Sequence, residues 1–271
     1  MKRRIINFVR NICVFALPLL SMNCGSTCPH RNWGEDAAIA PGWKRIGKSA
    51  AESALQTQTW VPLAAAALLA ISGTDAKIQD WANKNTPVFG STDNARKYSN
   101  YLLNASKWIY ITSAVILPGG DNIPVWLLNK SKGLAVGYAA ILSTQFATDG
   151  LKSLSGRERP DGSGNGSFPS GHTSAAAVYT MLTQRNIEYL RMNPVFESSI
   201  DVALNTLTLV TGWSRVEGNA HYPTDILFGA ALGNFIGSFI NDAFLGRHSS
   251  NIKLSTGYFT PYVYLNLSVR F

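Results

Sequence analysis

The sequence predicts an all-α fold, a bundle of helices followed by a short C-terminal β-strand. Most of the 271-residue chain consists of apolar stretches of helical length, separated by short segments rich in Gly, Pro and Asn. Only the last residues alternate with a period of two, which is typical of a strand. Hydrophobic residues make up 46% of the chain and charged residues 15%, so the composition excludes a disordered protein and fits a globular or membrane-associated one.

Residues 1–26 are expected to form a signal peptide or an N-terminal anchor. Basic residues from Lys2 to Arg10 precede a short apolar run and then small polar residues, which is the layout of an export signal and too short to cross a bilayer. We therefore expect an exported protein, in the periplasm or in a membrane and facing the periplasm. Cleavage near Ser26 would lower the net charge from +8 to +4, which gives little support for nucleic-acid binding and is compatible with an anionic substrate.

Residues 27–250 are expected to form the helical domain. Its helices are predicted at 43–57, 60–72, 94–117, 133–153, 170–183, 198–213 and 223–245, with an irregular loop at 155–168. The uncharged stretches are shorter than the roughly 20 apolar residues that a membrane-spanning helix needs. We therefore favour helices buried in a soluble or peripheral domain. The alternative is a thin or partly embedded membrane bundle.

Residues 251–271 form a tail of different character. Apolar residues alternate with others from Val263 to Phe271, which predicts a strand. The favoured interpretation is an edge strand or a short hairpin packed on the helical body. A strand that ends on a terminal Phe also resembles the insertion signal of outer-membrane proteins, so outer-membrane association is the alternative.

The segment SRVEGNAHYPTD (214–225) places a histidine directly before a predicted helix. Pro223 is tolerated in the first turn of a helix, so His221 lies at or just before the N-terminus. Asp225 in the first turn is close enough to accept a hydrogen bond from one ring nitrogen of His221, which leaves the other nitrogen nucleophilic. Taken alone, a structural His–Asp pair is the alternative interpretation.

The segment GSFPSGHTS (166–174) begins another helix with a histidine in its first turn. Ser170 is a favourable N-cap residue, and His172 follows it within the first turn. Backbone N–H groups at a helix start that contains Gly171 can bind an anion. An ordinary capped helix is the alternative.

The segment KSLSGRERP (152–160) supplies basic residues at a helix end and in the loop that follows. Lys152 ends a helix, and Arg159 precedes Pro160 and is thereby kept out of helical geometry. The two side chains could bind phosphate oxygens, whereas a solvated basic loop is the alternative. Arg157 is expected to be solvated, although it could reach a second phosphate. Trp213 and Tyr222 are expected either to line the pocket or to pack in the core.

Together, K-x6-RP, PSGH and SR-x5-H-x3-D resemble the signature of the type 2 phosphatidic acid phosphatase superfamily. This superfamily also contains bacterial class A acid phosphatases and vanadium-dependent haloperoxidases. Every signature position is met in order, at Lys152, Arg159, Pro160, Pro169, Ser170, Gly171, His172, Ser214, Arg215, His221 and Asp225. The motifs span residues 152–225, and the resemblance implies that a helical bundle of this superfamily's kind extends from about residue 50 to residue 245.

The resemblance also implies a role for each motif residue. His221 would attack phosphorus and form a phosphohistidine, with Asp225 orienting and polarising its ring. His172 would protonate the leaving oxygen and then activate water. The equatorial phosphate oxygens would be bound by a set of cations and donors, namely Lys152, Arg159, Arg215, the Ser170 hydroxyl and the Gly171 N–H.

These roles predict a phosphatase that needs neither a metal ion nor another cofactor, because three cations stand where a metal would. Two substrate classes remain open. "HYPTDILFGAALG" is more like the lipid phosphatases and favours a phosphorylated lipid, whereas "GSFPSGHT" is close to the class A acid phosphatases and favours small soluble phosphomonoesters. A lipid substrate is slightly favoured and implies contact with a membrane surface. A vanadium haloperoxidase and a non-catalytic envelope protein are the remaining alternatives.

Overall fold

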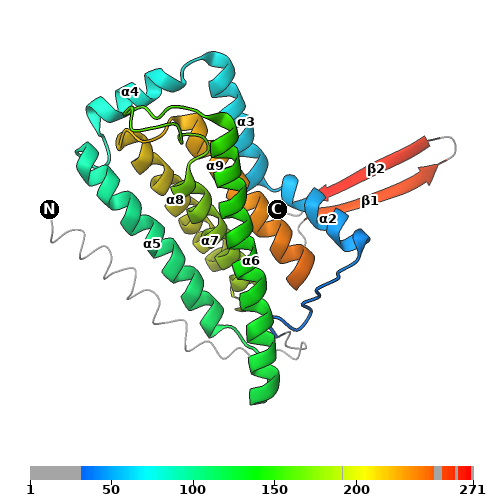
Figure 1. Ribbon diagram of the computed structural model, residues 1–271. Helices are drawn as coiled ribbons and strands as arrows, with labels where there is room; N and C mark the ends of the chain where they lie inside the picture. The colour runs from blue at the N-terminus through cyan, green and yellow to red at the C-terminus, as the bar shows by residue number, and fades with distance from the viewer. Residues whose placement is uncertain (1–31, 191, 247–251, 260–261, 270–271) are drawn as a thin grey trace. The chain divides into compact units, whose positions relative to one another are not determined.

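A computed structural model describes residues 32–190 and 192–246, together with the backbone of residues 252–259 and 262–269. Residues 1–26, which the sequence predicts to be an export signal or anchor, lie outside the described residues. The helices are α2 (Trp43–Ala54), α3 (Thr57–Ser72), α4 (Asp75–Asn85), α5 (Thr92–Ile116), α6 (Ile123–Ser155), α7 (Gly171–Ile187), α8 (Pro194–Glu217) and α9 (Pro223–Ile240). A short 3₁₀ turn η2 (Glu188–Leu190) follows α7, and a π-helical turn η3 (Asn241–Leu245) follows α9. The predicted all-α class is confirmed (Figure 1).

The helices differ from the predicted ones in two places. Helix α4 is absent from the prediction because its sequence, DAKIQDWANKN, is short and polar and lacks a clear apolar stripe. Helix α6 begins ten residues earlier than predicted, because Lys130 and Lys132 interrupt the apolar pattern. The earlier start has its own local signal, since the Asn122 side chain accepts a hydrogen bond from the Val125 N–H and a proline occupies the first turn.

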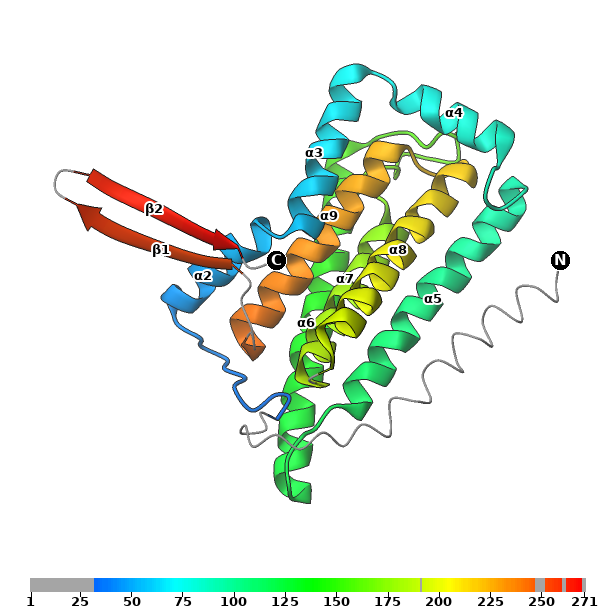
Figure 2. The same cartoon turned by 180° about the vertical axis from the view of Figure 1, so that it is seen from behind.

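Helix α7 is the central element of the bundle and is buried along most of its length. It packs against α5, α6, α8 and α9 (Figures 1 and 2). Close approach to α9 depends on glycine, because a Cβ at Gly233 would lie 2.3 Å from the Ser174 carbonyl oxygen and one at Gly229 would lie 2.8 Å from the Ser170 carbonyl oxygen. The first turns of α7 and α9 are thereby held side by side, with His172 in the first turn of α7 and His221 just before α9.

A buried carboxylate attaches the segment between α4 and α5 to α8. Glu217 is fully buried and accepts hydrogen bonds from the backbone N–H groups of Val88 and Phe89, each 3.0 Å long. The Trp213 indole N–H donates to the same carboxylate over 2.6 Å. The Asn83 amide donates to the Glu217 backbone carbonyl. These contacts hold α4 and the segment after it against the C-terminal end of α8.

A second buried ion pair lies near the C-terminal end of α7. The Arg185 guanidinium donates two hydrogen bonds to the Asp242 carboxylate, 2.8 and 2.9 Å long, and a third of 3.0 Å to Glu188. Both Arg185 and Asp242 are buried. Such a pair joins α7 to η3, and it is costly to break because one partner alone would be a buried, uncompensated charge.

The tail contains a β-hairpin. Strands β1 (Ile252–Phe259) and β2 (Tyr262–Val269) pair antiparallel, from Ile252 opposite Val269 to Phe259 opposite Tyr262. The strand predicted from the period-two pattern is therefore found as β2, and its partner is β1.

One described stretch is long and apolar enough to cross a membrane. It is the continuous helix Pro223–Leu245, whose most apolar window has a mean hydropathy of 1.2 and is 61% buried inside the bundle. The α2–α3 pair passes the same test only if its 52° bend is counted within one span. By length and composition alone this is weak evidence, since buried core helices have the same properties.

We expect Asp242→Asn to destabilise the fold by about 3–5 kcal/mol, because it leaves the Arg185 charge buried and only partly paired. The measurement is the free energy of unfolding from denaturant titration followed by circular dichroism. Asp80→Asn is the matched control, since it removes an exposed partner of Lys84 and should cost about 1 kcal/mol or less. Equal, small losses in both variants would contradict a stabilising role for the buried pair.

Candidate active site

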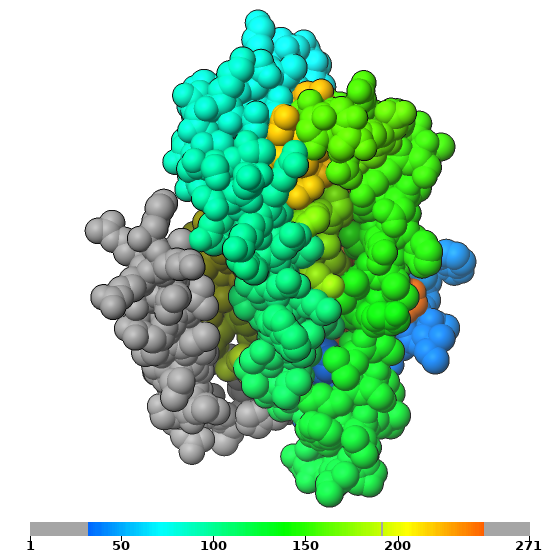
Figure 3. Space-filling model, turned by 60° about the vertical axis from the view of Figure 1, so that its left-hand side comes forward, coloured from blue at the N-terminus to red at the C-terminus, as the bar shows by residue number. Residues whose placement is uncertain are grey.

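The eight predicted site residues lie at four helix ends that meet. Lys152 is in the last turn of α6 and Arg215 in the last turn of α8. Arg159 lies in the loop 156–170, which leads to Ser170, Gly171 and His172 at the start of α7. His221 precedes α9, and Asp225 is in its first turn. Figure 3 shows a hollow beside α5 and the loop 156–170, in which the segment joining α8 to α9 is visible.

The His221 ring is held by a backbone carbonyl. Its Nδ1 lies 2.7 Å from the Ser167 carbonyl oxygen, which can only accept a hydrogen bond, so Nδ1 carries the proton and Nε2 has a free lone pair. The expected hydrogen bond to Asp225 is replaced by a longer contact, since the Asp225 Oδ2 atom lies 3.7 Å from Nδ1. Burial lowers the pKa of the imidazole below its ordinary value, and Arg215 acts in the same direction.

The Asp225 carboxylate is fully buried and has its own set of donors. Its Oδ2 accepts from the Ser167 hydroxyl at 2.5 Å and from the Tyr222 backbone N–H at 2.8 Å. Its Oδ1 accepts from Arg157 Nη1 at 2.7 Å. Burial alone would raise the pKa of this carboxyl, but these donors and the His221 ring hold it below the ordinary value. The carboxylate is therefore ionised beside the histidine.

The expectation that Arg157 is solvated is wrong. Its guanidinium pairs with Asp225 and with Asp75 of α4, each at 2.7 Å, and only a third of its side chain is exposed. The guanidinium carbon also lies 4.1 Å from the centroid of the Tyr222 ring. Two buried carboxylates determine this position, and neither lies near Arg157 in the sequence. Arg157 therefore belongs to the protein interior beside the site.

The three cations of the site are only weakly balanced by carboxylates. Among the described residues, no carboxylate lies within ion-pair distance of Arg159 or Arg215, and Lys152 has only Asp149 at 3.9 Å. Burial lowers the pKa of Arg215 to about 10, with Arg159 acting in the same direction. Its buried Nε has no hydrogen-bond partner among the described residues. Such a cluster is suited to binding an anion with several oxygens.

His172 faces the same cations and has a polar partner on α5. Its Nε2 lies 2.8 Å from the Asn100 side-chain oxygen. Burial, as the largest cause, and the charges of Arg215, His221, Lys152 and Arg159 together lower the pKa of the His172 imidazole to about 4. Because each of these charges affects the pKa of the His172 ring, their side chains lie close to it. A bound dianion would offset the cations and raise this pKa again.

The start of α7 lets a cation approach the backbone. A Cβ at Gly171 would lie 3.1 Å from the Lys152 Nζ atom, so any larger residue would crowd the lysine. Ser170 is the N-cap residue, as predicted, but its hydroxyl accepts from the Thr173 hydroxyl at 3.0 Å and not from the backbone. The Ser170 N–H donates to the Asp225 carbonyl, which ties the two helix starts together.

The sequence motifs do not indicate four further residues of the site: Asn100, Ser167, Arg157 and Asp75. Ser167 and Arg157 lie inside or next to the motifs, but nothing local in the sequence shows that they reach Asp225. Asn100 and Asp75 lie on α5 and α4, and only the packing of these helices brings them near the motifs. The two aromatic residues differ in their contacts, since Tyr222 contacts Arg157, whereas Trp213 lines an apolar cavity of about 550 Å³ with Pro223 and Ile226.

A metal centre has no candidate ligands in the part of the chain that the structure describes. No group of three or more His, Cys, Asp and Glu side chains is arranged there to hold a metal ion. The acidic residues of the site are already paired with Arg157 and backbone donors.

The described fold has a counterpart among solved structures. The chain is similar to the crystal structure of the first transmembrane PAP2 type phosphatidylglycerolphosphate phosphatase from Bacillus subtilis, with a TM-score of 0.51 and 20% sequence identity. The likeness covers 68% of this chain and 92% of that chain. At this identity the likeness establishes the fold alone.

The sequence match agrees with the fold. The PAP2 superfamily model matches residues 133–248, so the resemblance predicted from the motifs is confirmed over this part of the chain. The chain is also 40% identical over 82 residues to a lipid A 1-phosphatase from Porphyromonas gingivalis. That match covers 30% of this chain and 17% of the length of the relative.

We expect the His172 imidazole to titrate near pH 4 in the free protein and at higher pH when inorganic phosphate is bound. The reason is that phosphate neutralises the cations that disfavour the charged ring. The measurement is a proton NMR titration with and without phosphate, and His172→Gln identifies the resonance. A pKa that phosphate leaves unchanged would show that the anion binds elsewhere.

Proposed function

We propose that the protein is a metal-independent phosphatase that hydrolyses phosphate esters through a phosphohistidine intermediate on His221. One observation carries the proposal: two histidines at adjacent helix starts face a group of cations, two of which, Arg159 and Arg215, have no carboxylate within ion-pair distance among the described residues. A neutral, buried His221 with a free Nε2 is a nucleophile, and the cations bind the phosphate oxygens on which charge develops.

The first half of the reaction transfers the phosphoryl group to the protein. The His221 Nε2 lone pair attacks phosphorus, the bond between phosphorus and the ester oxygen breaks, and the leaving oxygen takes a proton from His172. The bond from Nδ1 to the Ser167 carbonyl keeps the ring oriented, and the ionised Asp225 stabilises the positive charge that the ring acquires.

The second half releases phosphate. His172, now neutral, removes a proton from a water molecule, the hydroxide oxygen attacks phosphorus, and the bond between phosphorus and Nε2 breaks. Lys152, Arg159 and Arg215 remain in contact with the phosphate oxygens in both halves and supply the charge that a metal ion provides in other phosphatases.

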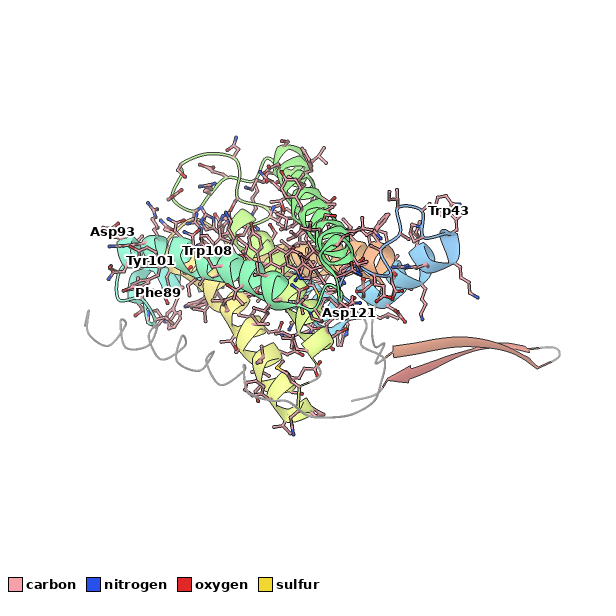
Figure 4. The ribbon with its side chains drawn as sticks, turned by 90° about the horizontal axis from the view of Figure 1, so that it is seen from below. Trp43, Phe89, Asp93, Tyr101, Trp108 and Asp121 are labelled. Carbon is pink, nitrogen blue, oxygen red and sulfur yellow. The ribbon has the colours of Figure 1, made fainter. Side chains whose placement is uncertain are left out.

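The proposed substrate is a phosphorylated lipid. The sequence relative named above is a lipid A 1-phosphatase, and large apolar side chains are exposed on several helices. Trp43 on α2 is 87% exposed and Trp108 on α5 is 62% exposed (Figure 4). Exposed apolar surface of this kind marks contact with lipid or with another protein. We therefore propose that the protein acts at a membrane surface, and an exported location remains the prediction of its N-terminal sequence.

The test is phosphate release by the purified protein from two substrates, a lipid phosphate in detergent and a small phosphomonoester. We expect the lipid to be preferred by kcat/KM, and His221→Ala to abolish release from both, because no second histidine can take the place of the nucleophile. Preference for the small ester would favour the soluble acid phosphatase alternative. Near-normal activity of His221→Ala would show that His221 is not the nucleophile and would refute the mechanism.

His172→Ala should impair esters with poor leaving groups more than p-nitrophenyl phosphate, because only a poor leaving group needs the proton that His172 donates. The measurement is the ratio of kcat/KM for an alkyl phosphate and for p-nitrophenyl phosphate, in the wild type and in the variant. The same loss for both esters would count against the acid role of His172.

A further inference from the structure

Asp75, the first residue of α4, accepts two hydrogen bonds from the first turn of α9 and a third from the loop 156–170. Its Oδ1 accepts from the Thr224 backbone N–H at 2.9 Å, and its Oδ2 accepts from the Thr224 hydroxyl at 2.6 Å. The same Oδ2 accepts from Arg157 Nη2 at 2.7 Å. Asp75 is buried, so each of these bonds replaces water that the carboxylate has lost.

Arg157 completes the connection to Asp225. Its Nη1 donates to the Asp225 Oδ1 and to the Thr224 hydroxyl, both at 2.7 Å. The Thr224 hydroxyl therefore accepts from Arg157 and donates to Asp75, and every group of the network has a consistent donor or acceptor role. One guanidinium is held between two carboxylates, and the second of these lies beside the His221 ring.

We propose that Asp75 and Arg157 are positioning residues of the reaction, which hold the Asp225 carboxylate against His221 and set how much negative charge the His221 ring experiences. The proposal rests on the proposed function, in which His221 is the nucleophile. Neither residue touches the substrate. Both act through Asp225 and through the first turn of α9.

The network has an electrostatic consequence with a definite sign. Arg157 partly neutralises Asp225, so its removal exposes the His221 ring to more negative charge and raises the pKa of the imidazole. Asp225 stays ionised in that case, because the Ser167 hydroxyl and the Tyr222 N–H still donate to it. When the Asp75 charge is removed, the Arg157 charge neutralises Asp225 more completely. The His221 ring then experiences less negative charge, which lowers the pKa of the imidazole.

Other charged groups near His221 stay unchanged in these variants. Arg215 on α8 acts directly on the His221 ring, and His172 on α7 interacts with it. Lys152 on α6 and Arg159 in the loop 156–170 act on His172. Because these groups are the same in all the proteins compared, a difference in the pKa of His221 between variants is due to the network of Asp75, Arg157 and Asp225. A purely structural role would lower stability or activity without moving the pKa of His221 in opposite directions.

The first experiment needs no activity. The His221 imidazole is titrated by NMR in the wild type, Arg157→Gln and Asp75→Asn, with His221→Ala to identify the resonance. We expect a higher pKa than in the wild type for Arg157→Gln and a lower pKa for Asp75→Asn. Unchanged values, or shifts in one direction for both variants, would overturn the proposal even if the wild type is an active phosphatase.

The second experiment measures the effect on the reaction. We expect kcat to fall about tenfold to a hundredfold in Arg157→Gln, with KM little changed, because the nucleophile is misplaced while the phosphate-binding cations remain. The acid limb of the plot of kcat/KM against pH should shift to higher pH in Arg157→Gln and to lower pH in Asp75→Asn, since the nucleophile must be neutral. Arg157→Lys keeps the charge and should recover part of the loss.

Arg185→Gln is the matched control, because it also breaks a buried Arg–Asp pair but lies at the other end of α7. It should lower the unfolding temperature and leave kcat and the acid limb as in the wild type. The proposal is wrong if Arg157→Gln loses kcat only in proportion to its loss of folded protein. A wild type that releases no phosphate would instead refute the proposed function, while the NMR titration would still test the network.

Discussion

The Asp225 carboxylate carries a charge that the fold buries completely, and the placement of three separate segments depends on it. A buried carboxylate is costly unless strong donors replace the water that it loses. Here the donors come from the loop 156–170 through Arg157 and Ser167, and from the backbone at Tyr222. Because Arg157 also pairs with Asp75, the same charge fixes α4 over the start of α9.

The loop 156–170 thus has two functions at the His221 ring. The Ser167 side chain donates to Asp225, while the Ser167 backbone carbonyl accepts from the histidine. One residue therefore orients the carboxylate and the imidazole together. The Ser167 N–H in turn donates to the Arg157 carbonyl, so the two donor residues of Asp225 are themselves joined by the loop backbone. A rigid loop of this kind is what a preorganised site requires.

The cations on the other side of the site differ from Asp225, because their neighbours carry charge of the same sign. Lys152 and Arg215 each have a lowered pKa because burial disfavours their charge and because neighbouring cations repel it. A phosphate dianion would remove this repulsion on binding, which is why we propose that the cluster binds the phosphate group of the substrate.

The sequence by itself determined the helical class, the C-terminal strand and the residues of the signature motifs, because apolar periodicity and short motifs are local properties of the chain. It could not determine which atoms meet. The acceptor of the His221 proton is 54 residues away in the sequence, the Asn100 partner of His172 is 72 away, and Thr224 is 149 residues from Asp75. Only the packing of α4, α5 and the loop 156–170 against the starts of α7 and α9 decided these contacts, since a buried charge takes its donors from whichever segments the fold brings near.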